Sequence, residues 1–442
     1  MKKFLQIMTC LLVFFYASGS LRAEQEIVLG LDQPQVYGPM LKGLRVGLMV
    51  NQSSINKDGR HAIDKLLEEQ KQYGFTVTTL YSVEHGLRGK HDAGFGDDSH
   101  LDSKSGLPIV SLYGHDADGR SRANPTAEQL ANVDIVIYDL QDVGVRFFTY
   151  TISMHHMMES LQLQKKKLMV FDRPNPLGAD VYGPILKEEY ISGIGMHPVP
   201  MVHGLTSGEF ASMIVGEKWL THFDKKSWQA FGTAKWQLPP TDLLLIKMQN
   251  YRHDRHYSLP VRPSPNLRTD LAVALYPSLG VFEATSVNMG RGSAHPFEQL
   301  GFPDKRFYVN TCYHVDINQQ KAGWPQAGKE VCGERLTTDS VPHGKATIRL
   351  FAKWWYKFAE AGYQLVLEDV KESDYLKWQE QAFLLRPLWL AKLTGDRSLE
   401  KLLLQALKDK LPLEEAVQNV ETSWKGDLDK YLQLRQKYLL YP

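Results

Sequence analysis

Short runs of apolar residues alternate with amphipathic segments along the first half of the chain. Apolar runs of strand length occupy residues 43–51, 75–83, 107–113, 133–140 and 167–172. Residues 61–70 and 149–163 place apolar side chains at helical spacing, and residues 126–131 are predicted to form a short helix. Strands that alternate with helices predict right-handed βαβ units and a parallel sheet covered on both faces. The pattern therefore predicts an α/β fold with a Rossmann-like, three-layer N-terminal domain.

The pattern becomes irregular after the fifth apolar run. Proline and glycine are frequent in residues 173–204, which we expect to form a long loop of the kind that often carries function. Thr206 and Glu209 then have the spacing of a capping box at a helix start, and residues 243–248 are a further strand. No G-x-G-x-x-G follows the first strand, so the sequence does not indicate a dinucleotide cofactor.

A proline-rich connector separates two parts of the chain. Residues 260–265 contain three prolines, and we place the domain boundary there. We expect a Rossmann-like catalytic domain at 27–255 and a smaller C-terminal α/β domain at 260–442 that completes a cleft. Within the second domain the pattern predicts helices over 345–358 and 384–440, with a strand over 363–367.

The first residues have the pattern of a secretory signal peptide. A short basic start at Met1–Lys3 precedes an apolar run from Phe4 to Phe15, and small residues lead to Ala23. The apolar run is too short to span a bilayer comfortably, so we do not expect stable membrane insertion. Residues 1–23 are therefore predicted to be a cleaved signal peptide, and the mature chain to be extracytoplasmic, either periplasmic or secreted.

Composition and cysteine content narrow the possible partners. Hydrophobic residues make up 43% of the chain and charged residues 23%, with a net charge of +1. This balance lacks the basic surface typical of nucleic-acid binding, so a small-molecule or oligosaccharide substrate is expected. Cys312 and Cys332 remain after signal cleavage, and a pair closing a loop of that size would stabilise the fold by roughly 3 kcal/mol.

Polar residues follow the ends of several predicted strands. Because ligands bind beyond the carboxyl ends of strands in open α/β sheets, these residues are predicted to form a site. They are Glu84, His85 and Arg88 after the second strand, Asp142, Arg146 and Tyr150 after the fourth, Asp172, Arg173 and Asn175 after the fifth, and His203 before the next helix. One such group alone would also fit a surface turn, but several at one edge favour a site.

Glycoside hydrolysis by two carboxyl groups fits these residue types best. Glu84 is the preferred general acid, because the apolar strand before it can desolvate its carboxyl group. Asp142 is a candidate for the second carboxylate, with an ion pair to Arg146 four residues later as the alternative. Glu283 lies between apolar neighbours and is a third candidate, with an ion pair to an arginine as its alternative.

The remaining candidates are predicted to bind substrate. Arginine side chains suit bidentate binding of a ligand carboxylate, and aromatic rings suit stacking on a sugar face. We assign Arg146, Arg173 and Arg291 to the first role, Tyr150 to the second, and His85, Arg88, Asp172, Asn175, His203, Asn266 and Asn288 to further polar contacts.

A metal site is not expected. His85, His91, Asp92 and His203 are metal-ligating residue types, but no H-E-x-x-H pattern or close pair on one helix supports a site. The G-x-S-x-G pattern of a serine hydrolase is also absent.

Taken together, the motifs resemble those of the NamZ-like exo-β-N-acetylmuramidases, a family once known only as a domain of unknown function. The matching segments, which extend over the chain after the signal peptide, are residues 84–89, 139–150, 172–176, 203–209, 263–266, 276–283, 288–292 and 437–441. The resemblance implies a Rossmann-like catalytic domain, a smaller second domain and a site in the cleft between them. It also implies that Glu84 is the leading catalytic residue, and it leaves the second carboxylate open.

The expected function is that of an exo-acting glycoside hydrolase. The resemblance implies release of terminal β-linked N-acetylmuramic acid from the non-reducing end of peptidoglycan fragments, and the lactyl carboxylate of that sugar would account for the arginines. Two alternatives remain open. One is a periplasmic muropeptide- or sugar-binding protein without turnover, and the other is a metal-dependent amide hydrolase.

Overall fold

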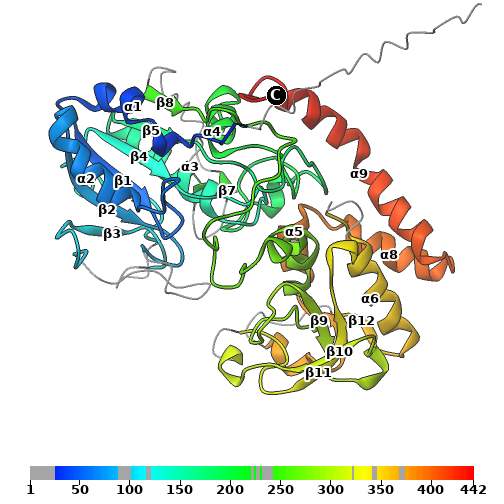
Figure 1. Cartoon of the computed structure of the whole chain (residues 1–442). Helices are drawn as coiled ribbons and strands as arrows, with labels where there is room; N and C mark the ends of the chain where they lie inside the picture. The colour runs from blue at the N-terminus through cyan, green and yellow to red at the C-terminus, as the bar shows by residue number, and fades with distance from the viewer. Residues whose placement is uncertain are drawn as a thin grey trace, which may run out of the picture.

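The structure is a computed structural model that describes residues 25–87, 101–115, 121–220, 223–224, 229–230, 242–320, 323–340, 346–367 and 374–442. The predicted signal peptide therefore lies outside the described residues. A central sheet with helices on both faces forms the first part of the chain, and a smaller mixed part lies beside it (Figure 1). No helix within the described ranges is long and apolar enough to cross a membrane.

The central sheet has six parallel strands in the order β3-β2-β1-β4-β5-β8. Their bounds are β1 Arg45–Val50, β2 Thr76–Ser82, β3 Ile109–Ser111, β4 Ile135–Asp139, β5 Lys167–Phe171 and β8 Leu243–Ile246. Each lies within a predicted apolar run. Continuous apolar runs are typical of parallel strands because both sheet faces are buried, and every residue of β4 is buried.

Two hydrophobic clusters cover the two faces of the sheet. Val46, Leu48 and Val50 of β1 pack with helices α1 (Pro34–Leu41) and α2 (Ala62–Tyr73). The intervening Met49 belongs to the other cluster, with helices α3 (Tyr150–Leu163) and α4 (Ser207–Gly216). Alternate side chains of a strand point to opposite faces, so this division confirms the predicted three-layer arrangement.

Local rules account for most of the predicted helices, with one exception. Thr206 Oγ1 accepts a hydrogen bond from the Glu209 backbone N–H, and Glu209 accepts one from the Thr206 N–H, so α4 starts with the predicted capping box. The helix predicted over residues 126–131 is wrong, because that segment forms only hydrogen-bonded turns. Thr126 caps Gln129 there (3.2 Å), but the six-residue segment is too short to propagate a helix.

The smaller part combines helices with a three-stranded antiparallel sheet in the order β10-β11-β9 and a parallel pair, β12 and β13. The strands are β9 Gln299–Phe302, β10 Thr311–His314, β11 Glu330–Arg335, β12 Gln364–Val366 and β13 Ala382–Leu384. The helices are α5 Asp270–Leu279, α6 Arg349–Glu360, α7 Pro387–Thr394, α8 Ser398–Lys408 and α9 Leu413–Arg435. The predicted helical tail over 384–440 is thus three helices.

Short elements complete the described chain. A two-stranded pair is formed by β6 Phe223–Asp224 and β7 Gln229–Ala230. The 3₁₀ helices are η1 Gly30–Asp32, η2 Glu188–Tyr190, η4 Gly280–Ala284, η5 Lys305–Phe307, η6 Ile317–Gln320, η7 Thr338–Ser340 and η9 Tyr375–Trp378.

The last helix returns the chain to the first domain. In Figure 1, α9 (red) runs from the smaller part towards α4, where the C-terminus lies. Tyr431 of α9 donates a hydrogen bond to the His203 carbonyl (2.8 Å), and Arg435 donates one to the Ala179 carbonyl (2.8 Å). Tyr441 then packs with Ile27 and neighbouring apolar residues of the first part. The C-terminal segment therefore fastens the two parts together.

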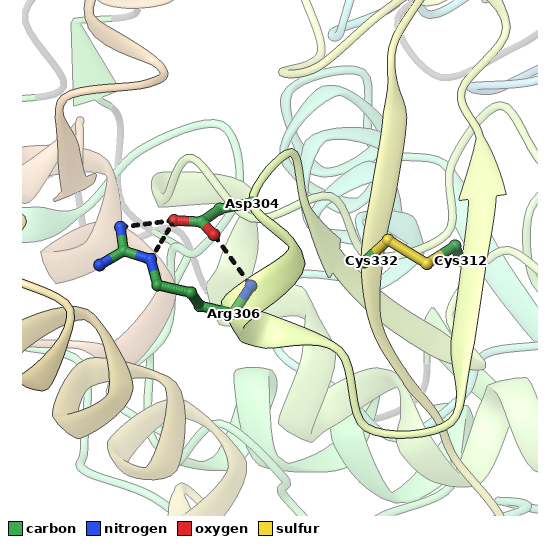
Figure 2. The surroundings of a disulfide bond; sticks show 4 residues. All are labelled: Asp304, Arg306, Cys312 and Cys332. Carbon is green, nitrogen blue, oxygen red and sulfur yellow. Dashed lines mark hydrogen bonds and ion pairs between the residues drawn. A yellow bond between two sulfur atoms is a disulfide. The ribbon is translucent and has the colours of Figure 1, made fainter.

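A disulfide joins two neighbouring strands of the antiparallel sheet, the outer strand β10 and the central strand β11. Cys312 of β10 lies directly opposite Cys332 of β11, and the two sulfur atoms are bonded. Figure 2 shows this bond beside the turn that leads into β10, where Asp304 accepts hydrogen bonds from the Arg306 backbone N–H (2.9 Å) and Nε (2.8 Å). The disulfide closes the segment between the two strands into a loop.

Replacing both Cys312 and Cys332 by serine is expected to lower the free energy of unfolding by roughly 3 kcal/mol, because the unfolded chain regains the freedom of the open loop. Urea unfolding followed by tryptophan fluorescence measures the change. Reduced wild-type protein should unfold like the variant, and the variant should not respond to reductant. Equal unfolding midpoints for the oxidised wild type and the variant would contradict the expectation.

Candidate active site

A cavity of about 700 Å³ lies between the two parts of the chain. Its walls include the segment after β2, the start of α3, the segment before α5, the η4 helix and helix α7. This volume falls in the range of small-molecule binding sites. The cavity is therefore the leading candidate for the active site.

Glu84 lies in this cavity, just beyond the end of β2. Thr149 Oγ1 donates a hydrogen bond to Glu84 Oε2 (2.7 Å), and the Tyr113 hydroxyl donates one to Oε1 (3.2 Å). Burial, and then the negative charge of Glu84, raise the pKa of Tyr113, so this phenol remains a donor. Two hydroxyl groups thus hold the carboxyl group in place. Because a hydroxyl can both donate and accept a hydrogen bond, it can bind either a charged or a protonated carboxyl group.

The position of Glu84 follows from the strand order. Glu84 follows β2 and Thr149 follows β4, and these two strands flank β1 on opposite sides. The strand order reverses at this point, which is where open α/β sheets bind ligands. The hydrogen bond between Thr149 and Glu84 therefore spans the switch point of the sheet.

A tight turn after β2 aims this segment into the cavity. His85 has a φ of 71° and Gly86 a φ of 75°, and the Gly86 N–H bonds to the Val83 carbonyl (2.9 Å). A left-handed conformation is uncommon for residues other than glycine and is concentrated at functional sites. His85 is buried and also lines the cavity.

Aromatic side chains form one wall of the cavity. The Tyr276 ring lies edge-on to those of Phe147 (5.2 Å between centroids) and Phe297 (5.1 Å). Tyr150, another lining residue, accepts a hydrogen bond from Asn51 Nδ2 at its hydroxyl (2.7 Å). Such rings give a sugar an apolar face to pack against.

A carboxylate and a guanidinium face the cavity from the second part of the chain. Arg291 Nη2 lies 2.8 Å from Glu283 Oε1, and both side chains line the cavity. The guanidinium carbon lies 4.0 Å from the ring centroid of Trp324 and 4.9 Å from that of Phe297. Arg291 Nε is buried and has no hydrogen-bond partner among the described residues. The pair therefore places one fixed cation, with an unused donor, in the wall.

The structure brings together only some of the residues predicted from the sequence. Those that line the cavity are Glu84, His85, Tyr150, Asn266, Glu283 and Arg291. Those that are described but do not line it are Asp142, Arg146, Asp172, Arg173, Asn175, His203 and Asn288. Arg88 lies outside the described residues, as do His91 and Asp92.

The residues away from the cavity are buried and bonded within the protein. Arg173 pairs with Asp139 at the end of β4 (2.6 Å). Asn175 donates a hydrogen bond to the Leu205 carbonyl (3.2 Å), and Asn288 donates one to the Arg291 carbonyl (3.2 Å). These contacts organise the segments after the strands.

Asp172 holds the start of α4. Its Oδ2 accepts hydrogen bonds from Thr206 Oγ1 (2.7 Å) and the Tyr441 hydroxyl (2.7 Å), and its Oδ1 accepts one from the Gly208 N–H (2.8 Å). Burial, and then the charge of Glu209, raise the pKa of Asp172 to about 6. A carboxylate at a helix N-terminus stabilises the helix.

Asp142 and His203 lie next to each other behind the cavity wall. His203 Nε2 is 3.9 Å from Asp142 Oδ1, and that oxygen accepts a hydrogen bond from the Gly144 N–H (2.7 Å). Burial raises the pKa of Asp142 to about 7, although backbone hydrogen bonds oppose the shift. Burial also lowers the pKa of His203 to about 3. Each group is thus driven towards its neutral form.

Several residues that line the cavity are not predicted from the sequence. Thr149 and Tyr113 hold Glu84, while Trp324, Trp389 and Lys392 come from the second part of the chain. His156 of α3 also lines the cavity, with its Nδ1 3.2 Å from Glu159. Tyr113 and Thr149 do follow strands β3 and β4, but the sequence does not show that their hydroxyl groups contact Glu84. Trp324, Trp389, Lys392 and His156 lie away from the strand ends, and no local motif marks them. Within the described ranges, no group of three or more His, Cys, Asp or Glu side chains could hold a metal ion.

The fold and the cavity together define the class of protein. A Rossmann-like parallel sheet and a smaller second part enclose a cavity with fixed carboxyl groups, an arginine and aromatic rings. Such a site is suited to a polar small molecule or a sugar.

Comparison with known proteins identifies the family. Residues 46–271 match the family described as "Exo-beta-N-acetylmuramidase NamZ, N-terminal", and residues 274–441 match its C-terminal counterpart. The peptidoglycan beta-N-acetylmuramidase NamZ of Bacillus subtilis (strain 168) is 37% identical over 419 residues, which cover 92% of this chain and 89% of the relative. The chain belongs to the NamZ family, a family of glycosidases.

Solved structures share the fold. A DUF1343 family protein from Bacteroides fragilis NCTC 9343 is 29% identical with a TM-score of 0.73, and the match covers 94% of this chain and 99% of that chain. A second DUF1343 family protein from the same organism is 23% identical with a TM-score of 0.70, at the same coverage. These neighbours confirm the predicted two-part α/β architecture.

Asp142 gives a test of the pH dependence of stability. Its folded-state pKa of about 7 lies above its ordinary value of 3.8, so its contribution is most favourable below pH 4 and is lost as the pH rises through 7. Asp142→Asn should remove this loss, which amounts to roughly 4 kcal/mol at most. Urea unfolding between pH 4 and pH 8 should show the variant gaining stability relative to the wild type.

Asp134 provides the matched control. Hydrogen bonds from Arg45 lower the pKa of Asp134 to about 2, so Asp134→Asn should change stability by a constant amount across pH 5 to 8. A constant difference between the wild type and Asp142→Asn over this range would show that Asp142 does not titrate there.

Proposed function

We propose that the chain is an exo-acting glycoside hydrolase that releases terminal β-linked N-acetylmuramic acid from the non-reducing end of peptidoglycan fragments. Membership of the NamZ family supports the substrate class. The observation that carries the mechanism is Glu84, held by two hydroxyl groups inside a cavity that also contains the Glu283–Arg291 pair.

Glu84 acts as the general acid in this proposal. Cleavage of a glycosidic bond needs a carboxylic acid that protonates the departing oxygen. Thr149 and Tyr113 bind both oxygens of Glu84 and so fix the direction in which the proton is presented. Precise placement of such a group, rather than its presence alone, is what accelerates the reaction.

Glu283 is the proposed second carboxyl group. It lines the same cavity, whereas Asp142 is sealed behind the wall. Arg291 Nη2 lies 2.8 Å from Glu283 Oε1, and a carboxylate in this place could act either as a nucleophile or as a base that activates water.

Arg291 is proposed to bind the lactyl carboxylate of the terminal sugar. Three arginines are predicted from the sequence to bind a carboxylate. Arg146 and Arg173 bind groups within the protein away from the cavity, whereas Arg291 lines the cavity. Trp324 and Phe297 hold its guanidinium plane in place. A planar guanidinium with a donor still unused is suited to a carboxylate ligand.

We further propose that the chain works outside the cytoplasm, as periplasmic or secreted protein. The signal-peptide pattern of residues 1–23 supports this location. The bonded pair of Cys312 and Cys332 supports it independently, because disulfides persist mainly in oxidising compartments.

Glu84→Gln is expected to lower kcat by about 10²- to 10⁴-fold, the usual contribution of a general acid. The loss should be much smaller for an aryl glycoside with a strongly activated leaving group, because that group departs without protonation. Release of N-acetylmuramic acid and of the aryl group measures the two rates. Near-normal release from the natural fragment would exclude Glu84 as the acid.

Glu128→Gln, a change at an exposed carboxylate outside the cavity lining, is the matched control and should behave like the wild type. Thermal unfolding of both variants checks that the fold is intact.

Arg291→Gln is expected to remove the preference for a sugar that carries a carboxylate. Wild-type protein should be inhibited more strongly by N-acetylmuramic acid than by N-acetylglucosamine. In the variant the ratio of the two inhibition constants should change by about tenfold, towards equal inhibition by the two sugars. Arg291→Lys keeps the charge without the planar donor group and should retain part of the preference for N-acetylmuramic acid. An unchanged ratio of the two inhibition constants in both variants would contradict the assignment.

A further inference from the structure

The cavity contains a second group of aromatic and cationic side chains besides Arg291 with Trp324. We call this group the α7 platform, and it consists of Trp389 and Lys392 on α7 with Arg386 just before that helix. The Arg386 guanidinium carbon lies 4.4 Å from the ring centroid of Trp389, and Lys392 Nζ lies 6.0 Å from it. Trp389 and Lys392 both line the cavity.

The Glu283–Arg291 pair occupies another part of the cavity wall. Arg291 Nη2 lies 2.8 Å from Glu283 Oε1, and the rings of Trp324 and Phe297 flank its guanidinium group. Lys392 takes no part in this ion pair, so the α7 platform is a separate group of side chains in the wall.

Two features of the α7 platform indicate a ligand. The indole Nε1 of Trp389 is buried, and no described residue accepts a hydrogen bond from it. A buried donor without a partner is rare in native proteins and calls for an explanation such as a bound ligand. Within the described ranges, Lys392 forms no ion pair, so its ammonium group remains available to an anion.

The size of the cavity supports a second subsite. Its volume of about 700 Å³ lies well inside the range of sites that enclose drug-sized ligands, which are larger than a single sugar ring. An enzyme that cleaves a glycosidic bond must also hold part of the fragment beyond that bond if binding there is to assist the reaction.

We propose that the α7 platform is the subsite for the part of the glycan beyond the scissile bond, where Lys392 binds a carboxylate of the departing fragment and Trp389 packs against it. This inference rests on the proposed function. The ligand class is a sugar chain that carries carboxylate groups, as muramic acid residues and their peptides do. The indole N–H would donate to a sugar or carboxylate oxygen.

The test compares two substrates in the same protein. One is an aryl β-glycoside of N-acetylmuramic acid, whose leaving group carries no carboxylate, and the other is a longer peptidoglycan fragment. Lys392→Gln should lower the ratio of kcat/KM for the longer fragment to that for the aryl glycoside by about tenfold. Lys392→Arg should restore most of the ratio, because the charge is kept.

The charge itself is tested by changing the substrate. A longer fragment in which only the carboxylates of the departing part are amidated, with the lactyl carboxylate of the terminal sugar kept, should show a similar fall in kcat/KM with the wild type. Lys392→Gln should lower kcat/KM for this amidated fragment little further. Trp389→Phe, which keeps a ring and removes the N–H group, should lower the ratio for both forms of the fragment. Lys401→Gln, at an exposed lysine of α8 outside the cavity lining, is the matched control.

The outcomes separate this inference from the proposed function. If the wild type hydrolyses both substrates and the ratio is the same in Lys392→Gln, the α7 platform is not a subsite and the proposed function stands. If the wild type hydrolyses neither substrate, both proposals fail. A lower ratio that Lys392→Arg restores supports the subsite.

Discussion

The cavity depends on one buried arginine that joins the two parts of the chain. Arg146 donates hydrogen bonds to the carbonyl oxygens of Pro184 (3.1 Å), Val199 (2.6 Å) and Leu393 (2.8 Å). Leu393 lies in the last turn of α7, where unpaired carbonyls and the helix dipole favour a cation. Burial lowers the pKa of Arg146 to about 9, so it remains charged at neutral pH. The same contact fixes the long loop after β5 and the helix that carries Trp389 and Lys392.

Buried polar residues at the strand ends therefore serve two purposes in this fold. Asp172 and the Asp139–Arg173 pair satisfy backbone groups and side chains around the sheet edge. Glu84 instead presents its carboxyl group to the cavity while two hydroxyls hold it. Removing one partner of a buried charged pair leaves an unpaired charge, which is strongly destabilising. These buried residues are thus constrained by the fold itself, although they do not line the cavity.

The sheet could be predicted because its signals are local. Each strand of the parallel sheet lies within a continuous apolar run, and Thr206 with Glu209 marks the start of α4. The cavity could be predicted only in part, because strand-end residues such as Glu84 are visible in the sequence but their neighbours are not. Trp324 and Lys392 reach the cavity through the packing of distant segments. From the sequence alone, Arg146 is predicted to bind substrate. Its buried hydrogen bonds to the carbonyls of distant residues could not be foreseen, because such contacts leave no signal in the sequence.

The end of the long loop of residues 173–204 covers the segment that follows β4. Val202 bridges to Val145, and the His203 N–H bonds to the Gly144 carbonyl (3.2 Å), so the end of this loop covers the segment after β4. Asp142 is sealed beneath that cover, and burial raises its pKa to about 7. Glu84 is instead half-buried and lines the cavity. Two carboxyl groups that look alike in the sequence therefore differ in their surroundings, because the end of a distant loop buries Asp142 while Glu84 faces the cavity.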